Sequence, residues 1–539
     1  MDILFFIFFI AIFVVIFAIL GYLGYKKTKT SEDYYVAGRK MGGIIIAFSY
    51  GATFISAVAL IGFSGIASVY GHSVLWLAFL NVSVGIFIAF VFYGFRTRKM
   101  GLSLKALTLP ELLGNRFNST KLQAASGLII AIFMVAYTSA VFLAISNLFQ
   151  VTFSIPYEYC VVIFTVIVGV YLIFGGLYAV MWTHAIQGVL MVIGMLILTI
   201  GIYTMLGGVG PAHEATAALT PSILESIGSP AATSAPNGLT SMPPVLSKPF
   251  MLVLTIIFGV GIGVLAQPQL VVRYLSAKNE KALRRAVPYG GIFILLMTFF
   301  AFSIGPLCNE LMVNAPSYNS ALTESLMYPT KIVAGQAVPN PDAVVPLIVN
   351  NFFPTWFIVL FLFAILAAAM STASALFHTA GASIGRDVCE KGLMKVCSEK
   401  KSIKITRVAT IAIIIATLLI SLYPPAVVAV LTSFFFGLMA CTFLAPYTLM
   451  LYWRETSRVG AWAGMLGGFI FTMCWYILVY FKTAPQLIGD SITSNYMINM
   501  LDPIFIGLPL SFILTFVFSK LVKQDKEEQK TMAKSFEAI

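Results

Sequence analysis

Hydroxyl side chains are grouped in the segment AAAMSTAS, residues 367–374, inside a long apolar stretch. On a helix, Ser371 and Thr372 lie three and four residues beyond Ala368, so their hydroxyls share one face with the Ala368 carbonyl. A hard monovalent cation such as Na⁺ binds to hydroxyl and carbonyl oxygens, which need no buried carboxylate and still allow release. The spacing therefore suggests one wall of a Na⁺ site. The alternative is that these small residues only pack helices together, with hydroxyls bonded to their own backbone.

An interrupted helix can supply the remaining oxygens of such a site from its backbone. The stretch Ala47–Gly65, AFSYGATFISAVALIGFSG, lies in a hydrophobic run of 29 residues, 42–70. This run is longer than the roughly 20 residues that a membrane-spanning helix needs. Its glycines and small hydroxyl residues predict a break, which is tolerated at membrane depth where it lines a cavity. A small-residue packing face would explain the same composition.

The composition is that of an integral membrane protein. Of 539 residues, 59% are hydrophobic and 10% are charged, and the mean hydropathy is +0.95. The first apolar run, 3–25, is too long for a signal-peptide core and has no cleavage site, so we expect it to remain as a span. The six cysteines have no metal-ligand spacing and predict no disulfide. We do not expect the protein to be an enzyme, because the sequence offers no cluster of histidines and carboxylates and no nucleophile–base pair.

Hydropathy predicts thirteen spans in the cell membrane, with the N-terminus outside and the C-terminus in the cytoplasm. In this orientation, 30 of the 33 lysines and arginines fall in inner segments or in the tail from Lys520, as the positive-inside rule requires. The net charge of +12 is therefore explained by the membrane, and no nucleic-acid partner is expected. The predicted spans are about 3–25, 42–70, 74–95, 122–149, 157–180, 184–207, 250–272, 287–311, 354–385, 408–424, 426–453, 460–481 and 503–519.

A second interrupted helix is predicted in the span 250–272 and the loop after it. Three closely spaced glycines precede Pro268, which removes a backbone donor and favours a kink or unwinding. The two interrupted spans are the second and the seventh of the predicted spans, five apart. This spacing is expected for two inverted five-span repeats around a shared site. The chain is therefore predicted to be an all-α polytopic membrane protein with five parts. These are an extra span with an inner loop (1–41), a first repeat (42–207), an outer loop (208–249), a second repeat (250–453), and two final spans with a cytoplasmic tail (454–539).

Several motifs together resemble the sodium:solute symporter family. They are DYYVAGR (33–39), GATFISA (51–57), FGGLYAVMWTHAIQG (174–188), AQPQLVVRY (266–274), and AAAMSTASA followed by GRD. The resemblance covers nearly the whole chain. It implies a LeuT-like fold of thirteen or fourteen spans and symport coupled to Na⁺. It also implies a Na⁺ site made of backbone oxygens at Ala52, Ile55 and Ala368 and hydroxyls at Ser371 and Thr372.

Two histidines depart from or extend this pattern. Many family members carry an aspartate at the position of His184, and that carboxylate is associated with a second Na⁺ or with ion release. A neutral histidine cannot replace its charge, so we expect one Na⁺ per cycle. His184 is then either a packing residue or, because histidine titrates near neutrality, a pH-sensitive gate. His378, two turns from Ser371 on the same face, either lines the inner exit path or packs in the core.

The solute is less well defined than the ion. A cavity between the two breaks is predicted, and no charged residue is expected at mid-depth there. A sugar would need more planar amides and carboxylates than these spans offer. The sodium–proline branch has an acidic residue in the second span and large aromatics in the seventh, whereas TFISAV is more similar to the monocarboxylate and pantothenate branches. We expect a small organic anion of the monocarboxylate type, with a neutral amino acid or other polar solute as the alternative. The predicted lining residues are Thr53, Phe54, Ala57, Tyr137, Val260, Val264, Gln267 and Gln269.

Other functional classes fit the sequence less well. A symporter-like membrane sensor would need a signalling module, and the last predicted span is followed only by a short charged tail. A channel would not need two paired breaks around an occluded site. The expected partners are therefore Na⁺, a small organic solute and the lipid bilayer, with no obligatory protein partner.

Overall fold

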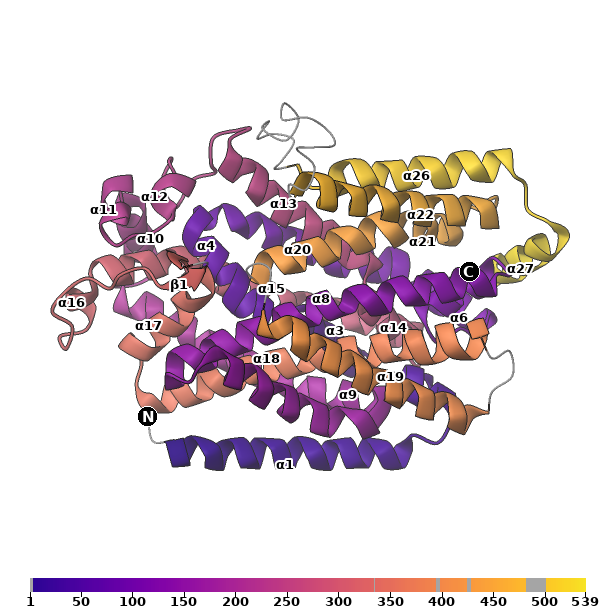
Figure 1. Cartoon of the computed structure of the whole chain (residues 1–539), viewed down its shortest axis with the longest axis horizontal. Coiled ribbons are helices and arrows are strands. Elements are labelled where there is room, and N and C mark those ends of the chain that lie inside the picture. The colour runs from indigo at the N-terminus through magenta and orange to yellow at the C-terminus, as the bar shows by residue number, and fades with distance from the viewer. Residues whose placement is uncertain (1–2, 334, 394–397, 424–427, 481–500) are drawn as a thin grey trace.

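The computed structural model is a bundle of long helices that run roughly parallel to one axis (Figure 1). It describes residues 3–333, 335–393, 398–423, 428–480 and 501–539. Most helices are apolar along their whole length. Helices that must bury apolar surface on all sides, against neighbours or lipid, have this composition. α1 (Ile3–Lys27) lies along one edge of the bundle, and α22 (Arg458–Trp475) pairs with α26 (Ile504–Leu521) at the opposite edge.

The predicted number of thirteen spans is not confirmed as a count. In the described part of the chain, ten helices are long and apolar enough to cross a membrane. Two further apolar helices, Gly43–Phe54 and Tyr157–Gly169, are shorter. They fall within the predicted spans 42–70 and 157–180, and the break after Phe54 shortens the helix in the first of these spans.

The first half of the bundle contains the first interrupted helix. Its elements are α2 (Ser31–Val36), η1 (Ala37–Arg39), α3 (Gly43–Phe54), η2 (Val58–Phe63), α4 (Ser64–Tyr70), η3 (Gly71–Val74), α5 (Leu75–Val82), η4 (Ser83–Gly94), α6 (Phe95–Ser103), α7 (Leu109–Arg116), α8 (Thr120–Phe153) and α9 (Tyr157–Met205). The second half, up to the last helix of the predicted repeat, contains α13 (Lys248–Gly263), η5 (Val264–Ala266), α14 (Pro268–Leu275), α15 (Glu280–Val313), α18 (Thr355–Ala382), η7 (Ser383–Leu393), α19 (Glu399–Leu422), α20 (Val428–Met439), η8 (Ala440–Leu444) and α21 (Ala445–Tyr452).

One predicted turn is wrong. The segment 181–183 was expected to separate two spans, but it lies inside the helical part of α9. The helix breaks instead at Gly176, where φ is +58° and a Cβ atom would come within 3.0 Å of the Tyr34 ring. Glycine adopts this backbone conformation without steric penalty and leaves room for Tyr34.

The connecting segments cover one end of the bundle. They form the short helices α10 (Val209–Ala218), α11 (Pro221–Ser226), α12 (Ala231–Ser234), α16 (Ala315–Tyr318), η6 (Pro341–Ala343) and α17 (Val344–Phe352), and an antiparallel pair of strands, β1 (Thr330–Val333) and β2 (Gln336–Pro339). The predicted outer loop 208–249 has its own small apolar core around Leu224 and Leu239.

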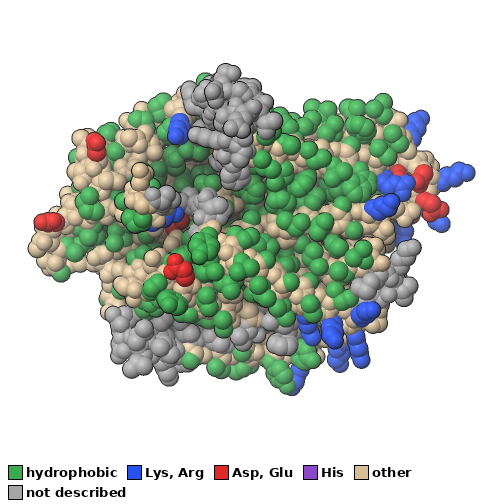
Figure 2. Space-filling view, viewed as in Figure 1, with side chains coloured by type: hydrophobic (Ala, Val, Ile, Leu, Met, Phe, Trp, Pro, Cys, Tyr) green, Lys and Arg blue, Asp and Glu red, His purple; other side chains and the backbone are tan. Residues whose placement is uncertain are grey.

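The opposite end of the bundle is basic. Lysine and arginine side chains gather there, whereas the surface between the two ends is largely hydrophobic (Figure 2). This is the end that the positive-inside rule predicts to face the cytoplasm, and we call it the basic end. The last helix, α27 (Lys526–Glu537), lies there after η9 (Tyr476–Tyr480) and α26. Arg458 forms ion pairs with Asp525 and Glu528 that fix this helix to the bundle.

Candidate functional site

The first break lies where the sequence predicts it. α3 ends at Phe54, and Ile55 has extended backbone angles, φ −85° and ψ 91°. The chain becomes helical again at Ala57, and the next turn closes on the carbonyl of Ser56. The last carbonyls of α3 are therefore available to groups outside the helix.

Hydroxyls of α18 meet these carbonyls. The Ser371 hydroxyl lies 2.7 Å from the Ala52 carbonyl oxygen and 2.9 Å from that of Ala368. The Thr372 hydroxyl lies 3.0 Å from the Thr53 carbonyl oxygen and 3.5 Å from that of Ala52. Four of the five residues predicted to bind Na⁺ are thus close together and fully buried. The oxygens that they offer to an ion are all neutral.

The fifth predicted ligand, Ile55, follows Phe54 in the break, and its own N–H donates to the Gly51 carbonyl. The structure adds an oxygen that the sequence analysis did not assign to the ion, the carbonyl of Thr53. Thr53 was expected to contact the solute through its side chain. The spacing of residues along α18 does not reveal which carbonyls of α3 lie opposite its hydroxyls. This is why the Thr53 carbonyl was missed.

The second break lies at Val264–Gln267. α13 tightens into the single turn η5, Gln267 is extended, and Pro268 begins α14. The Gln267 amide donates to the Gly263 carbonyl, and the Gln269 amide donates to the Gln267 side chain. The Gln267 side chain thus binds a carbonyl at the break and accepts from Gln269, whose own Oε1 has no partner among the described residues.

A small cavity lies between the two breaks. Three of the eight predicted solute contacts line it: Phe54, Tyr137 and Val260. The other predicted residues, Thr53, Ala57, Val264, Gln267 and Gln269, are buried but do not line this cavity. Its other walls come from four elements, η2, α5, α15 and α20. Sequence patterns within each element do not predict that these four meet. The remaining lining residues are Ile55, Ser56, Val58, Ala59, Phe63, Leu77, Asn81, Phe302, Thr432 and Phe436.

His184 lies beside the proposed ion site. Its Nε2 is 2.9 Å from the Ser374 hydroxyl, and its Nδ1 is 3.2 Å from the Thr53 hydroxyl. The guanidinium of Arg273 lies 3.5 Å from Nδ1 and 3.0 Å from the same Thr53 hydroxyl. A guanidinium can only donate, so Nδ1 accepts and Nε2 carries the proton that faces Ser374. The geometry therefore favours the neutral imidazole.

Arg273 was missed as a site residue. The sequence analysis counted it among the basic residues of an inner loop, whereas it is a fully buried residue of α14. A signal was available, because Arg273 lies four residues after Gln269 and so shares its helical face. Arg273 donates to the Gln269 carbonyl at 2.9 Å.

His378 lines a second small cavity, toward the basic end. Its Nε2 donates to the Tyr34 carbonyl at 3.0 Å, and its ring lies 5.4 Å from the Tyr34 ring. The cavity also contacts Thr108 and Pro268. His378 therefore lies on the side of Ser371 that faces the basic end, and its place on an exit path stays a prediction.

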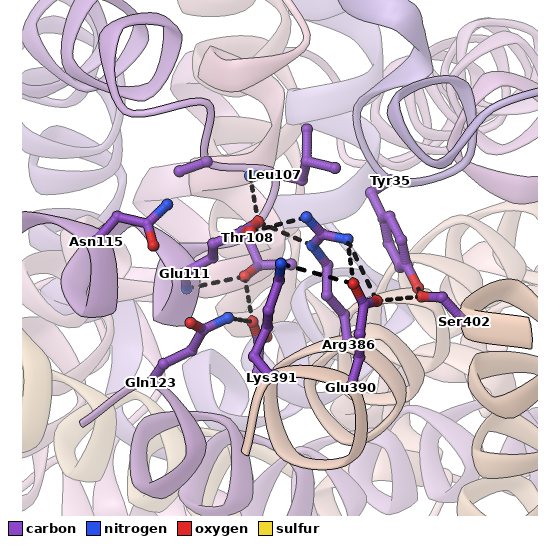
Figure 3. A network of polar contacts seen from close by, with 12 residues as sticks. Tyr35, Leu107, Thr108, Glu111, Asn115, Gln123, Arg386, Glu390, Lys391 and Ser402 are labelled. Atoms are coloured by element: carbon purple, nitrogen blue, oxygen red, sulfur yellow. Dashed lines mark hydrogen bonds and ion pairs between the residues drawn. The ribbon is translucent and has the colours of Figure 1, made fainter. Parts of the chain in front are cut away.

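Polar contacts join four elements beyond this cavity (Figure 3). Arg386 of η7 forms a two-pronged ion pair with Glu111 of α7, at 2.7 and 2.9 Å. Arg386 also approaches Glu390, which bonds to Ser402 of α19. The Tyr35 hydroxyl of α2 lies 3.0 Å from Ser402. This network, which we call the basic-end network, joins α2, α7, η7 and α19.

Comparison with known proteins identifies the class. Residues 34–468 match the profile of the sodium:solute symporter family. The osmoregulated proline transporter OpuE of Bacillus subtilis is 26% identical over 94% of this chain and 96% of its own. The sodium/proline symporter of Staphylococcus aureus (strain JH9) is 28% identical over 93% of this chain and 90% of its own. A solved Na⁺-coupled sialic acid symporter, in a substrate-bound outward-open state, has a TM-score of 0.70 and 18% identity, covering 95% of this chain and 96% of that one.

Proposed function

Since the chain belongs to the sodium:solute symporter family, with Na⁺ as the coupling ion, we propose that it carries one Na⁺ with one zwitterionic amino acid, proline first among candidates. The observation that carries the proposal is the meeting of the Ser371 and Thr372 hydroxyls with the carbonyls at the break of α3. Na⁺ would bind among Ala52, Ile55, Ala368, Ser371 and Thr372. The positive charge of the ion would then be stabilised at the carbonyl end of α3, where the helix dipole is negative.

The uncharged cavity supports a solute without net charge. Its polar lining is hydroxyl and amide, from Ser56, Asn81 and Thr432, and the rest is largely aromatic and aliphatic. The helix that resumes at Ala57 directs its N-terminal end toward this cavity, and that end favours a carboxylate. A zwitterion with an apolar ring fits such a surface better than a monoanion, which would need a further positive group.

The names of the relatives point in the same direction. The sequence analysis favoured a monocarboxylate, partly because large aromatics are absent from the seventh predicted span. In the structure, aromatic rings reach the cavity from other elements, with Tyr137 on α8, Phe302 on α15 and Phe436 on α20. These rings answer the objection based on the missing aromatics of the seventh span, and the neutral amino acid replaces the monocarboxylate as our proposal.

Uptake into proteoliposomes tests the substrate and the stoichiometry together. One Na⁺ with a zwitterion moves one net charge, so a potential, negative inside, adds roughly 2.3 kcal/mol per 100 mV. We expect radiolabelled proline uptake that needs Na⁺ and increases with this potential. A monoanion carried with one Na⁺ would show no such increase. Wholly Na⁺-independent uptake would contradict the ion site.

Substitution tests the ion site itself. Thr372→Ala removes one proposed ligand, and we expect the Na⁺ concentration for half-maximal uptake to rise at least about tenfold, a change of about 1.4 kcal/mol. Thr199→Ala is the matched control, because Thr199 is a buried threonine of α9 whose hydroxyl donates to the Met195 carbonyl of its own helix. An unchanged Na⁺ dependence in Thr372→Ala would disprove the assignment.

A further inference from the structure

Arg273 is a fully buried cation in surroundings of neutral groups. Its Nη1 donates to the Gln269 carbonyl, and its Nη2 donates to the Thr53 hydroxyl. Its Nε has no partner among the described residues. In that part of the chain, no carboxylate lies within ion-pair distance of Arg273. The imidazole of His184 lies 3.5 Å away.

The charge on Arg273 is permanent. A buried carboxylate or lysine can become neutral by exchanging a proton, but arginine keeps its proton in proteins. A buried charge without a counter-charge is costly, so such an arrangement is not explained by stability. The Arg273 charge instead attracts or repels any other charge that binds close to it.

The guanidinium and the proposed Na⁺ ligands share one residue. The Thr53 hydroxyl accepts from Arg273, and the Thr53 carbonyl faces the Thr372 hydroxyl. A second connection runs through His184 to Ser374, whose hydroxyl donates to the Ser371 carbonyl at 3.1 Å. These contacts place a fixed positive charge beside the ion site, on the side of α14.

We propose that Arg273 is a built-in cation that weakens Na⁺ binding by repulsion and occupies the oxygens that a second cation would need. This rests on the Na⁺ site of the proposed function. The oxygens are the Thr53 hydroxyl and the Gln269 carbonyl, which the guanidinium already uses. Arg273 thus keeps the coupling at one Na⁺ and speeds release of the ion, because repulsion raises the free energy of the bound state.

Arg273→Gln tests the repulsion. Removing the charge should lower the Na⁺ concentration for half-maximal binding about tenfold, which corresponds to about 1.4 kcal/mol. Binding is measured on the purified protein by the Na⁺ dependence of its thermal unfolding, so the test does not depend on transport. Arg273→Lys, which keeps the charge, should remain near the wild type. Arg116→Gln is the matched control, since Arg116 is equally buried but lies on α7 over Phe117.

A second pair of variants tests the occupied oxygens. In His184→Asp, the new carboxylate should pair with Arg273, so Na⁺ binding tightens but still saturates with a Hill coefficient of about 1. In His184→Asp combined with Arg273→Gln, the carboxylate has no partner and the oxygens are free. We expect this double variant to bind a second Na⁺, with a Hill coefficient approaching about 2.

The outcomes separate this inference from the proposed function. If Thr372→Ala weakens Na⁺ binding but Arg273→Gln leaves it unchanged, the ion site stands and the role of Arg273 is disproved. A second Na⁺ in His184→Asp alone would also overturn it, because the guanidinium would then not exclude the ion. If Thr372→Ala has no effect, the ion site itself is wrong.

Discussion

Arg386 and Arg273 are both buried arginines, with exposed fractions of 8% and 0%, but the protein surrounds them differently. Arg386 pairs with Glu111 and with Glu390, and the pair with Glu111 joins η7 to α7 (Figure 3). Within the part of the chain that the structure describes, the polar contacts of the Arg273 guanidinium are with a carbonyl, a hydroxyl and an imidazole, and none is with a carboxylate. The paired arginine joins elements near the basic end, whereas the unpaired one lies beside the proposed ion site.

A buried carboxylate at the other end of the bundle completes the comparison. Asp342 accepts from the Val428 N–H through Oδ2, and its Oδ1 has no partner among the described residues. Burial raises the pKa of Asp342 to about 6, against the smaller lowering effects of the Val428 hydrogen bond and the charge of Lys331. A lone buried carboxylate can thus relieve its charge by binding a proton, which Arg273 cannot do. The comparison indicates that Arg273, unlike Asp342, keeps its charge in the protein interior, beside the proposed ion site.

The largest effect is expected from breaking the pair at Arg386. Glu111→Gln removes the carboxylate that binds the guanidinium at two points, and leaves Arg386 with the more distant Glu390. Losing one partner of a buried pair costs about 3–5 kcal/mol, because the other charge stays buried. We expect the apparent melting temperature in detergent to fall clearly.

An exposed pair gives the matched control. Glu32 pairs with Arg39 at 2.7 Å, but the Glu32 side chain is 51% exposed. Exposed pairs contribute about 0–1 kcal/mol, so Glu32→Gln should change the melting temperature little. Equal effects of Glu32→Gln and Glu111→Gln on the melting temperature would show that burial of the Arg386–Glu111 pair does not increase its contribution to stability.

The sequence predicted the parts of the site that depend on local pattern. Glycine clusters and Pro268 predicted both breaks, and the spacing in α18 predicted that Ser371 would lie near the Ala368 carbonyl, as it does at 2.9 Å. These features follow from backbone geometry within one segment. The site assignments drawn from them remain proposals, which the substitutions above test.

Contacts between distant segments were not predictable in this way. Phe302 and Phe436 reach the cavity from α15 and α20, and no periodicity within either helix shows which neighbour it will face. Arg273 was assigned to a loop because basic residues are more common at span ends than inside them. Its burial depends on where the break lets α14 enter the bundle, which is a property of the packed structure.

A smaller effect is expected from the pH. The pKa of Asp342 is about 6 in the folded protein against 3.8 for the ordinary side chain. The folded state therefore binds the proton more tightly, and the stability from this group is greatest at low pH and is lost as the pH rises through 6. Between pH 5 and pH 7 the free energy of unfolding should fall by about 1 kcal/mol. Asp342→Asn should remove this part of the pH dependence, and a wild-type slope in that variant would contradict it.

The smallest effect on stability is expected at Arg273. Arg273→Met keeps much of the side-chain volume and removes the uncompensated charge, but it also leaves the Thr53 hydroxyl and the Gln269 carbonyl without their donor. These contributions oppose each other, and the free energy of unfolding should change by no more than about 1 kcal/mol. Thermal unfolding without Na⁺ measures this directly, and Glu111→Gln in the same assay gives the scale. A loss as large as that of Glu111→Gln would mean that Arg273 holds the fold together, as Arg386 does, and the contrast between the two arginines would fail.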